Sequence, residues 1–146
     1  MLEAATIRPP QPLSGVERFS GPVGPFLSDF ESWLSAMLDR HQPAGIIFES
    51  PILPEKTNPA AVCKLMGLAG VLQMAAFRRR IKWLRQAQPS SVKKHFCGSG
   101  RKGKDGVLNA CRARGWTWET DDEADALALW DYAASIYAAE RAGRRH

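Results

Sequence analysis

A short apolar strand followed by a long apolar helix leaves this chain few folds to adopt. The run AGIIF at 44–48 is rich in β-branched residues and predicts a buried strand. Asn58 and Pro59 are typical of an N-cap and a first-turn proline, here for a helix that runs to about Phe77. A second strand is expected over 81–86. Strands that alternate with helices indicate an α/β domain.

Four further helices are predicted from apolar spacing and from capping residues. They cover about 25–42, a short stretch capped by Ser90 or Ser91 and ended by Gly98, about 105–114 closed by Gly115, and about 121–139. The first 22 residues are rich in Pro and Gly and hold only a weak strand candidate near Gly15–Phe19. Between the helices, GSGRKGKDG at 98–106 is expected to form a flexible basic loop.

The size and composition of the chain favour a single soluble domain over residues 1–140, followed by a basic tail at 141–146. The chain has 146 residues, of which 45% are apolar and 24% charged, as in globular proteins. Its three cysteines are widely spaced, which argues against a disulfide framework or a zinc site and for a reducing, cytoplasmic location. No signal sequence is evident. The most apolar stretch, 65–77, is too short for a membrane span, so no membrane association is expected.

Charge is distributed unevenly along the chain. Residues 78–104 carry ten basic residues and no acidic one, whereas five acidic residues lie within 119–125. A basic segment of this density attracts a polyanion such as DNA, because neutralised phosphates release counterions. The alternative is an ordinary solvated face. The neighbouring acidic segment favours a cation between carboxylates and phosphates.

Two groups of carboxylates could carry chemistry. Glu49 directly follows the strand at 44–48, at the end of the strand where open α/β sheets bind their ligands. The second group is Asp121, Asp122, Glu123 and Asp125, at the start of the last helix. Acidic residues are favoured there by the helix dipole and by capping, but a cap needs only one or two of them. Asp122 and Asp125 share one helical face, which suits a divalent cation.

Four segments together resemble a known family. They are FESP at 48–51, KLMGLAG at 64–70, PSSVKKHFCGSGRKGKDGV at 89–107 and DDEADALAL at 121–129. Their order and spacing are similar to those of RuvC-like Holliday junction resolvases, especially the phage and prophage type. The resemblance implies an α/β, RNase H-like fold, with a mixed five-stranded sheet flanked by helices. It also implies a crossover junction endodeoxyribonuclease: a homodimer that cleaves branched, four-way junction DNA with a divalent metal, Mg²⁺ or Mn²⁺.

The resemblance assigns roles to particular residues of this chain. Glu49, Asp122 and Asp125 match the carboxylates that bind two metal ions, with Asp121 as an alternative to Asp122. The basic segment matches the part that contacts DNA, which makes candidates of Lys93, Lys94, Arg101, Lys102 and Lys104. Lys94 or Lys104 could also neutralise charge in the transition state. His95 is a weaker candidate for acid–base chemistry, and Trp116 and Trp118 are expected in the core.

The N-terminus departs from the family pattern. The family opens with an apolar strand that carries an Asp, whereas only LEAAT at 2–6 is faintly similar here, with Glu3 in the Asp position as a possible metal ligand. We therefore expect either that the start of the chain is truncated or misassigned, or that the first strand is lost. The alternative function is a catalytically impaired nucleic-acid-binding module that kept the basic surface, and a third is a structural α/β domain. The helix at 58–77, with Met66 and Met74, could form part of a dimer interface or pack in the core.

Overall fold

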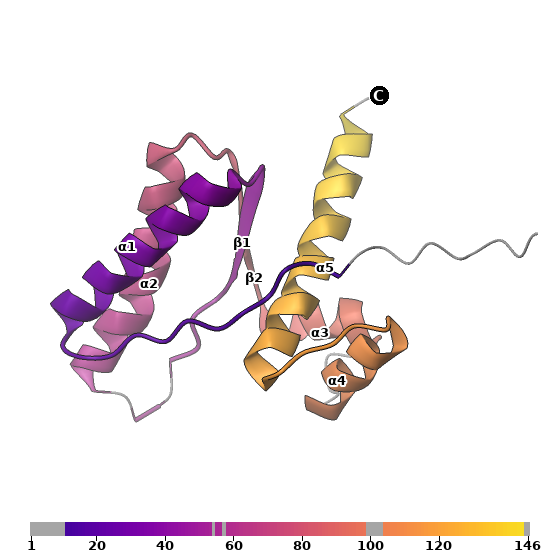
Figure 1. The fold of residues 1–146 in the computed structure, drawn as a ribbon, viewed down its shortest axis with the longest axis horizontal. Helices are drawn as coiled ribbons and strands as arrows, with labels where there is room; N and C mark the ends of the chain where they lie inside the picture. The colour runs from indigo at the N-terminus through magenta and orange to yellow at the C-terminus, as the bar shows by residue number, and fades with distance from the viewer. Residues whose placement is uncertain (1–10, 54, 57, 99–103, 145–146) are drawn as a thin grey trace, which may run out of the picture. The chain divides into compact units, whose positions relative to one another are not determined.

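The computed structural model describes residues 11–53, 55–56, 58–98 and 104–144 (Figure 1). Within these ranges the chain forms five helices and two strands, in the order α1, β1, α2, β2, α3, α4 and α5. Contacts divide the chain into two compact units, residues 17–89 and residues 1–16 with 90–146. Each unit is described by itself. The predicted single domain over 1–140 stays a prediction.

The first unit contains a helix–strand–helix–strand arrangement: α1 (Val23–His41), β1 (Gly45–Glu49), α2 (Pro59–Arg78) and β2 (Trp83–Ala87) (Figure 1). The two strands are parallel and in register from Gly45 opposite Trp83 to Glu49 opposite Ala87. A Cβ added at Gly45 would lie 2.6 Å from the Trp83 ring, so only glycine fits at this close approach. The α/β class predicted from the sequence is confirmed.

Local signals in the sequence set the ends of α1 and α2. Gln42 takes the left-handed conformation at φ 43°, and its N–H bonds to the carbonyl of Leu38 before Pro43 follows. The Asn58 side chain accepts a hydrogen bond of 2.8 Å from the backbone N–H of Ala61, which confirms the predicted N-cap. The chain therefore enters and leaves both helices close to the expected residues.

The core of the first unit lies between α1 and α2. Phe30, Leu34 and Leu38 of α1 are buried together with Ala75 of α2. Phe19, which precedes α1, packs edge-on against Phe30 and other aromatic rings. A Cβ at Gly67 would lie 2.7 Å from Leu27, so the absence of a side chain lets the helices approach each other closely.

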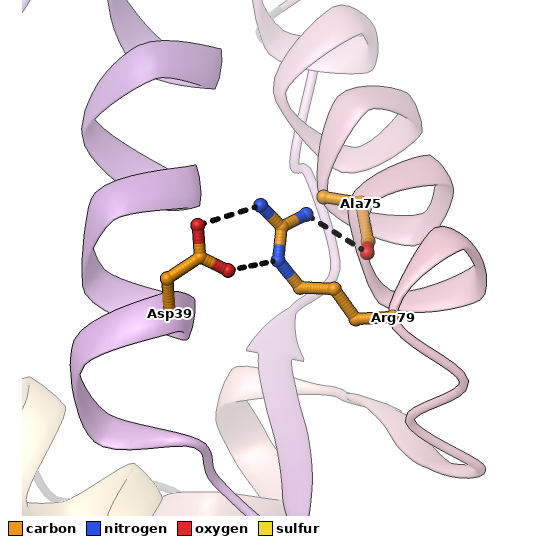
Figure 2. Close-up of polar contacts among 3 residues, drawn as sticks. All are labelled: Asp39, Ala75 and Arg79. Atoms are coloured by element: carbon orange, nitrogen blue, oxygen red, sulfur yellow. Dashed lines mark hydrogen bonds and ion pairs between the residues drawn. The ribbon is translucent and has the colours of Figure 1, made fainter.

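A salt bridge joins the same two helices at the C-terminal end of α2. The Arg79 guanidinium donates to both carboxylate oxygens of Asp39, at 2.9 and 3.5 Å, and to the carbonyl of Ala75 at 3.3 Å (Figure 2). Arg79 thereby ties α2 to α1 and also satisfies a carbonyl in the last turn of its own helix.

Three helices make up the second unit: α3 (Pro89–Cys97), whose first residue belongs to the first unit, α4 (Lys104–Ala113) and α5 (Asp121–Gly143). Gly115 follows α4 with φ 73°, as predicted for its C-terminal cap. Trp116 is buried and stacks on Phe96, as expected of a core residue. The other buried side chains of this unit include Val92, Val107, Cys111, Leu127 and Ala128.

Several sequence expectations are corrected. Gly15–Phe19 forms no strand, because Phe19 packs against the rings of α1 instead of joining a sheet. The expected loop over 98–106 is shorter, since Lys104 already begins α4, with Asp105 favourable in its first turn. The last helix continues to Gly143, into the expected basic tail. Within the described ranges the sheet has two parallel strands, where the resemblance implied a mixed sheet of five.

The expectation that no segment is long enough to cross a membrane also changes. Among the described residues, α2 is long and apolar enough to do so by length and composition alone. The core helix of a soluble protein passes the same test when it is mostly buried. Only 11% of the most apolar window of α2 is buried within the structure, so its exposed apolar residues need another explanation.

Candidate functional site

Glu49 stands at the C-terminal end of β1, where the sequence placed it. Its side chain is exposed, and the parallel ladder continues one step further because the N–H of Ser50 bonds to the carbonyl of Ala87 at 2.8 Å. Glu49 also lines a cavity of about 170 Å³ whose other walls are apolar and come from α1, β1, the following loop and α2. An apolar wall beside a carboxylate limits access of water to one side of that group.

The acidic start of α5 divides into a structural part and an exposed part. Glu123 is only 9% exposed, and its carboxylate accepts hydrogen bonds from the backbone N–H groups of Glu119 and Thr120. The Thr120 hydroxyl accepts in return from the N–H of Glu123 at 3.2 Å, which completes a capping box. One of the four acidic residues is thereby explained by helix capping.

The remaining acidic residues take no part in the capping box. Asp121 and Asp122 are exposed, and Asp125 is half-buried one turn along from Asp122. Asp125 also lies near the thiol of Cys111. Burial is the main cause that raises the pKa of Cys111, and the charge of Asp125 raises it further, whereas Arg114 lowers it. Of the pair at 122 and 125, Asp125 is thus the residue closer to the interior of its unit.

The basic candidates are described only in part. Lys93 is half-buried and Lys94 is exposed, and both lie in α3. Lys104 begins α4, but its side chain lies outside the described part of the structure, as do Glu3, Arg101 and Lys102 in full. For these residues the sequence prediction stands as a prediction.

A polar network of His95, Arg114 and Asp131, which the sequence did not predict, connects α3 to α5. The Asp131 carboxylate of α5 lies 2.9 Å from the Nε2 atom of His95. The same carboxylate lies 3.6 Å from the guanidinium of Arg114. Arg114 also lies over the Phe96 ring, 3.9 Å from its centroid. His95, which follows Lys93 and Lys94 in α3, therefore has a structural partner in Asp131. Spacing could not reveal it, because the three polar residues come from distant parts of the sequence.

The predicted metal ligands are distributed over both units. Glu49 belongs to the unit of residues 17–89, and Asp122 and Asp125 belong to the other. Within the residues that the structure describes, no three His, Cys, Asp or Glu side chains gather closely enough to hold a metal ion. The donor set itself suits Mg²⁺ or Mn²⁺, since all the candidates are carboxylates and two of them share a helical face.

The arrangement of these elements gives the chain an α/β, RNase H-like fold that is similar to the fold of RuvC. It is similar to the structure of Thermus thermophilus RuvC, with a TM-score of 0.61 and 22% sequence identity over 75% of this chain and 66% of that one. It is also similar to T. thermophilus RuvC in complex with a Holliday junction substrate, with a TM-score of 0.63, 23% identity and the same coverage of both chains.

The likeness is one of structure. The chain spans about two thirds of the length of these RuvC chains, at 66%. No protein-family profile matches the sequence, and no curated protein matches it either. The RuvC-like fold expected from four short segments is confirmed.

Proposed function

We propose that this chain is a metal-dependent, structure-selective endonuclease that cleaves branched DNA such as a four-way junction. The observation that carries the proposal is the RuvC-like fold, in which Glu49 ends β1 while Asp122 and Asp125 begin α5. One of the similar structures holds a Holliday junction substrate. The proposal includes a cytoplasmic homodimer of the phage or prophage type.

Glu49, Asp122 and Asp125 are the residues that would hold Mg²⁺ or Mn²⁺, with Asp121 in place of Asp122 as the alternative. When bound, divalent ions activate water and stabilise the leaving 3′ oxygen in phosphodiester hydrolysis. The chain's own residues position that chemistry. The capping box fixes the first turn of α5 and so fixes the backbone that carries both Asp side chains. Lys93 and Lys94, on α3, would bind the phosphates of the substrate.

The test is cleavage of a labelled four-way junction in Mg²⁺ or Mn²⁺. We expect Asp125→Asn and Glu49→Gln to lower the rate at least about 10³-fold, because each removes a charged ligand. Glu119→Gln is the matched control, since it removes an exposed carboxylate of the same acidic segment outside the pair. Asp121→Asn and Asp122→Asn, compared side by side, identify the second ligand on α5. Wild-type activity that survives Asp125→Asn would contradict the assignment.

The second candidate is a nucleic-acid-binding module without cleavage. One observation favours it: the sequence of residues 1–22 does not match the apolar, Asp-bearing pattern with which the family opens. Under this alternative the same junction is bound in a salt-sensitive manner and stays intact in either metal. Binding and cleavage measured on one preparation separate the two functions.

A further inference from the structure

Helix α3 carries two of the basic candidates, yet it is too short to be stable alone. It has nine residues, and isolated helices shorter than about 12–15 residues are marginal in water. Its buried residues are Val92 and Phe96, one turn apart on a single side of the helix. Lys93 is half-buried and Lys94 is exposed. The direction in which α3 presents these lysines therefore depends on contacts with other helices.

Arg114, directly after α4, contacts the buried side of α3. The carbon atom at the centre of its guanidinium lies 3.9 Å from the centroid of the Phe96 ring and 5.7 Å from that of the Trp116 ring. The two rings stack on each other. The Nη1 atom of Arg114 also donates to the carbonyl of Ala110 at 3.1 Å. Because a planar guanidinium held by a ring and a carbonyl keeps one orientation, Arg114 is a fixed cation where α3 meets the end of α4.

Asp131 of α5 joins this cation to a second side chain of α3. The same carboxylate oxygen lies 3.6 Å from Nη2 of Arg114 and 2.9 Å from Nε2 of His95. The His95 ring also packs edge-on against Tyr132, with 5.5 Å between the ring centroids. The Asp131 side chain is only 25% exposed, so water and salt screen these charges less than at an open surface. Helix α3 is thus held by α5 as well as by the core of its unit.

Two anchors on different sides of a helix fix its rotation. Successive residues of an α-helix lie about 100° apart around the axis, so His95 and Phe96 hold α3 from two directions. The apolar contact of Phe96 alone sets no precise angle, because the hydrophobic effect is non-directional. A charge-assisted hydrogen bond does set one. Since Lys94 directly precedes His95, its direction follows from the contact between His95 and Asp131.

The charge of Asp131 is unexpected beside a helix that binds DNA. A carboxylate near a phosphate-binding surface opposes binding through its charge. Asp131 therefore favours DNA binding only if its effect on the orientation of α3 outweighs that repulsion. The two effects have opposite signs, so a substitution of Asp131 distinguishes them.

We propose that Asp131 is a positioning residue that, through His95 and Arg114, orients α3 for contact with DNA phosphates. The inference rests on the proposed function, because Lys93 and Lys94 are the phosphate contacts proposed there. It adds that a carboxylate, which phosphates repel, strengthens the binding of DNA.

Fluorescence anisotropy of a labelled four-way junction, measured without divalent metal so that the DNA stays intact, tests the sign of the effect. We expect Asp131→Ala to weaken binding about fivefold or more, and to reduce the slope of log K against log salt by roughly one unit, because one phosphate contact is lost. Glu119→Ala is the matched control. It removes an exposed carboxylate of the same unit outside the network, so its affinity should equal or exceed that of the wild type. Asp131→Ala that binds as tightly as the wild type, or more tightly, overturns the proposal.

A background without the two lysines shows whether the effect runs through α3. We expect Asp131→Ala to cause no further loss of affinity when it is added to Lys93→Ala with Lys94→Ala. A residue that merely supported the fold would weaken binding in that background as well. Such a further loss overturns the positioning role.

Thermal unfolding of each variant, followed by circular dichroism, shows whether binding is measured on folded protein. If Asp131→Ala is unfolded at the temperature of the assay, Asp131→Asn takes its place, because its amide oxygen still accepts a hydrogen bond from His95 while the charge is lost. We expect Asp131→Asn to weaken binding about twofold or more, with the same dependence on the two lysines. An affinity equal to that of the wild type, or above it, overturns the proposal in this variant too.

A double-mutant cycle separates a His95 that acts through Asp131 from one that binds DNA itself. We expect His95→Ala combined with Asp131→Ala to weaken binding no more than either substitution alone, because both break the same contact. Additive losses would assign His95 to DNA directly and overturn its place in the network. A wild type that binds no junction refutes the proposed function as well, whereas a wild type that binds while every Asp131 variant matches it refutes the positioning role alone.

Discussion

At the scale of single residues, similar side chains have different tasks according to their surroundings. Glu123 and Asp125 are two positions apart in α5. The Glu123 carboxylate accepts hydrogen bonds from backbone N–H groups, whereas the Asp125 side chain is half-buried and takes no part in the cap. The sequence predicted both capping and metal binding for this acidic segment. It did not say which acid serves which purpose, because that depends on the side-chain direction within one helical turn.

Cys111 provides a prediction about pH. Burial raises the pKa of this thiol, so the folded state holds its proton more tightly than the unfolded chain does. Its contribution to stability is therefore complete below the ordinary thiol pKa of about 8.5 and is lost as the pH rises above that value. We expect the stability difference between the wild type and Cys111→Ala, measured by urea unfolding, to shrink between pH 8 and pH 10. Cys63→Ala controls for the loss of a thiol as such, and a difference independent of pH refutes the effect.

At the scale of secondary-structure elements, the ends of several helices and strands in both units follow from local signals. The Asn58–Pro59 start of α2, the strand up to Glu49 and the Gly115 cap were all predictable, because each depends on neighbours in sequence. The contacts between elements could not be predicted from the sequence. The Asp39–Arg79 bridge, the His95–Asp131 pair and the exposure of α2 depend on residues far apart in the chain, which spacing cannot reveal.

The salt bridge of Figure 2 should stabilise the α1–α2 pair measurably. We expect Asp39→Asn to lower the free energy of unfolding by about 0.5–1 kcal/mol, because Arg79 donates to both carboxylate oxygens and is itself largely shielded. Glu31→Gln is the matched comparison. Its partner Arg78 lies 3.6 Å away, and 62% of the Arg78 side chain is exposed, so we expect a change below about 0.3 kcal/mol. Equal effects in thermal unfolding would show that the geometry in Figure 2 contributes nothing.

At the scale of the whole molecule, the distribution of charge and the RuvC-like fold both support the proposed binding of DNA. Ten basic residues without an acidic one cover 78–104, and α3 presents two of them on a helix that the Asp131 network holds in place. The fold class was predictable from four short segments. The number of strands in the sheet was not predicted correctly, because the resemblance implies further strands whose sequence pattern residues 1–22 do not match.

Binding of DNA should respond to salt through α3. We expect Lys93→Ala combined with Lys94→Ala to weaken junction binding and to reduce the slope of log K against log salt by roughly one to two units. Arg40→Ala with Lys56→Ala removes the same charge from the other unit and should leave the slope nearly unchanged. Fluorescence anisotropy over a salt series measures both. An unaltered slope in the lysine variant would remove α3 from the DNA-binding surface.

The contact between Gly45 and the Trp83 ring constrains how related chains can diverge. Because any side chain at position 45 would overlap that ring, an ancestor or descendant that replaces Gly45 must also carry a smaller residue at position 83. The two positions are 38 residues apart by their numbering, yet the residue at 83 limits what position 45 can accept. A substitution of Gly45 alone should be eliminated by selection wherever the paired strands are retained.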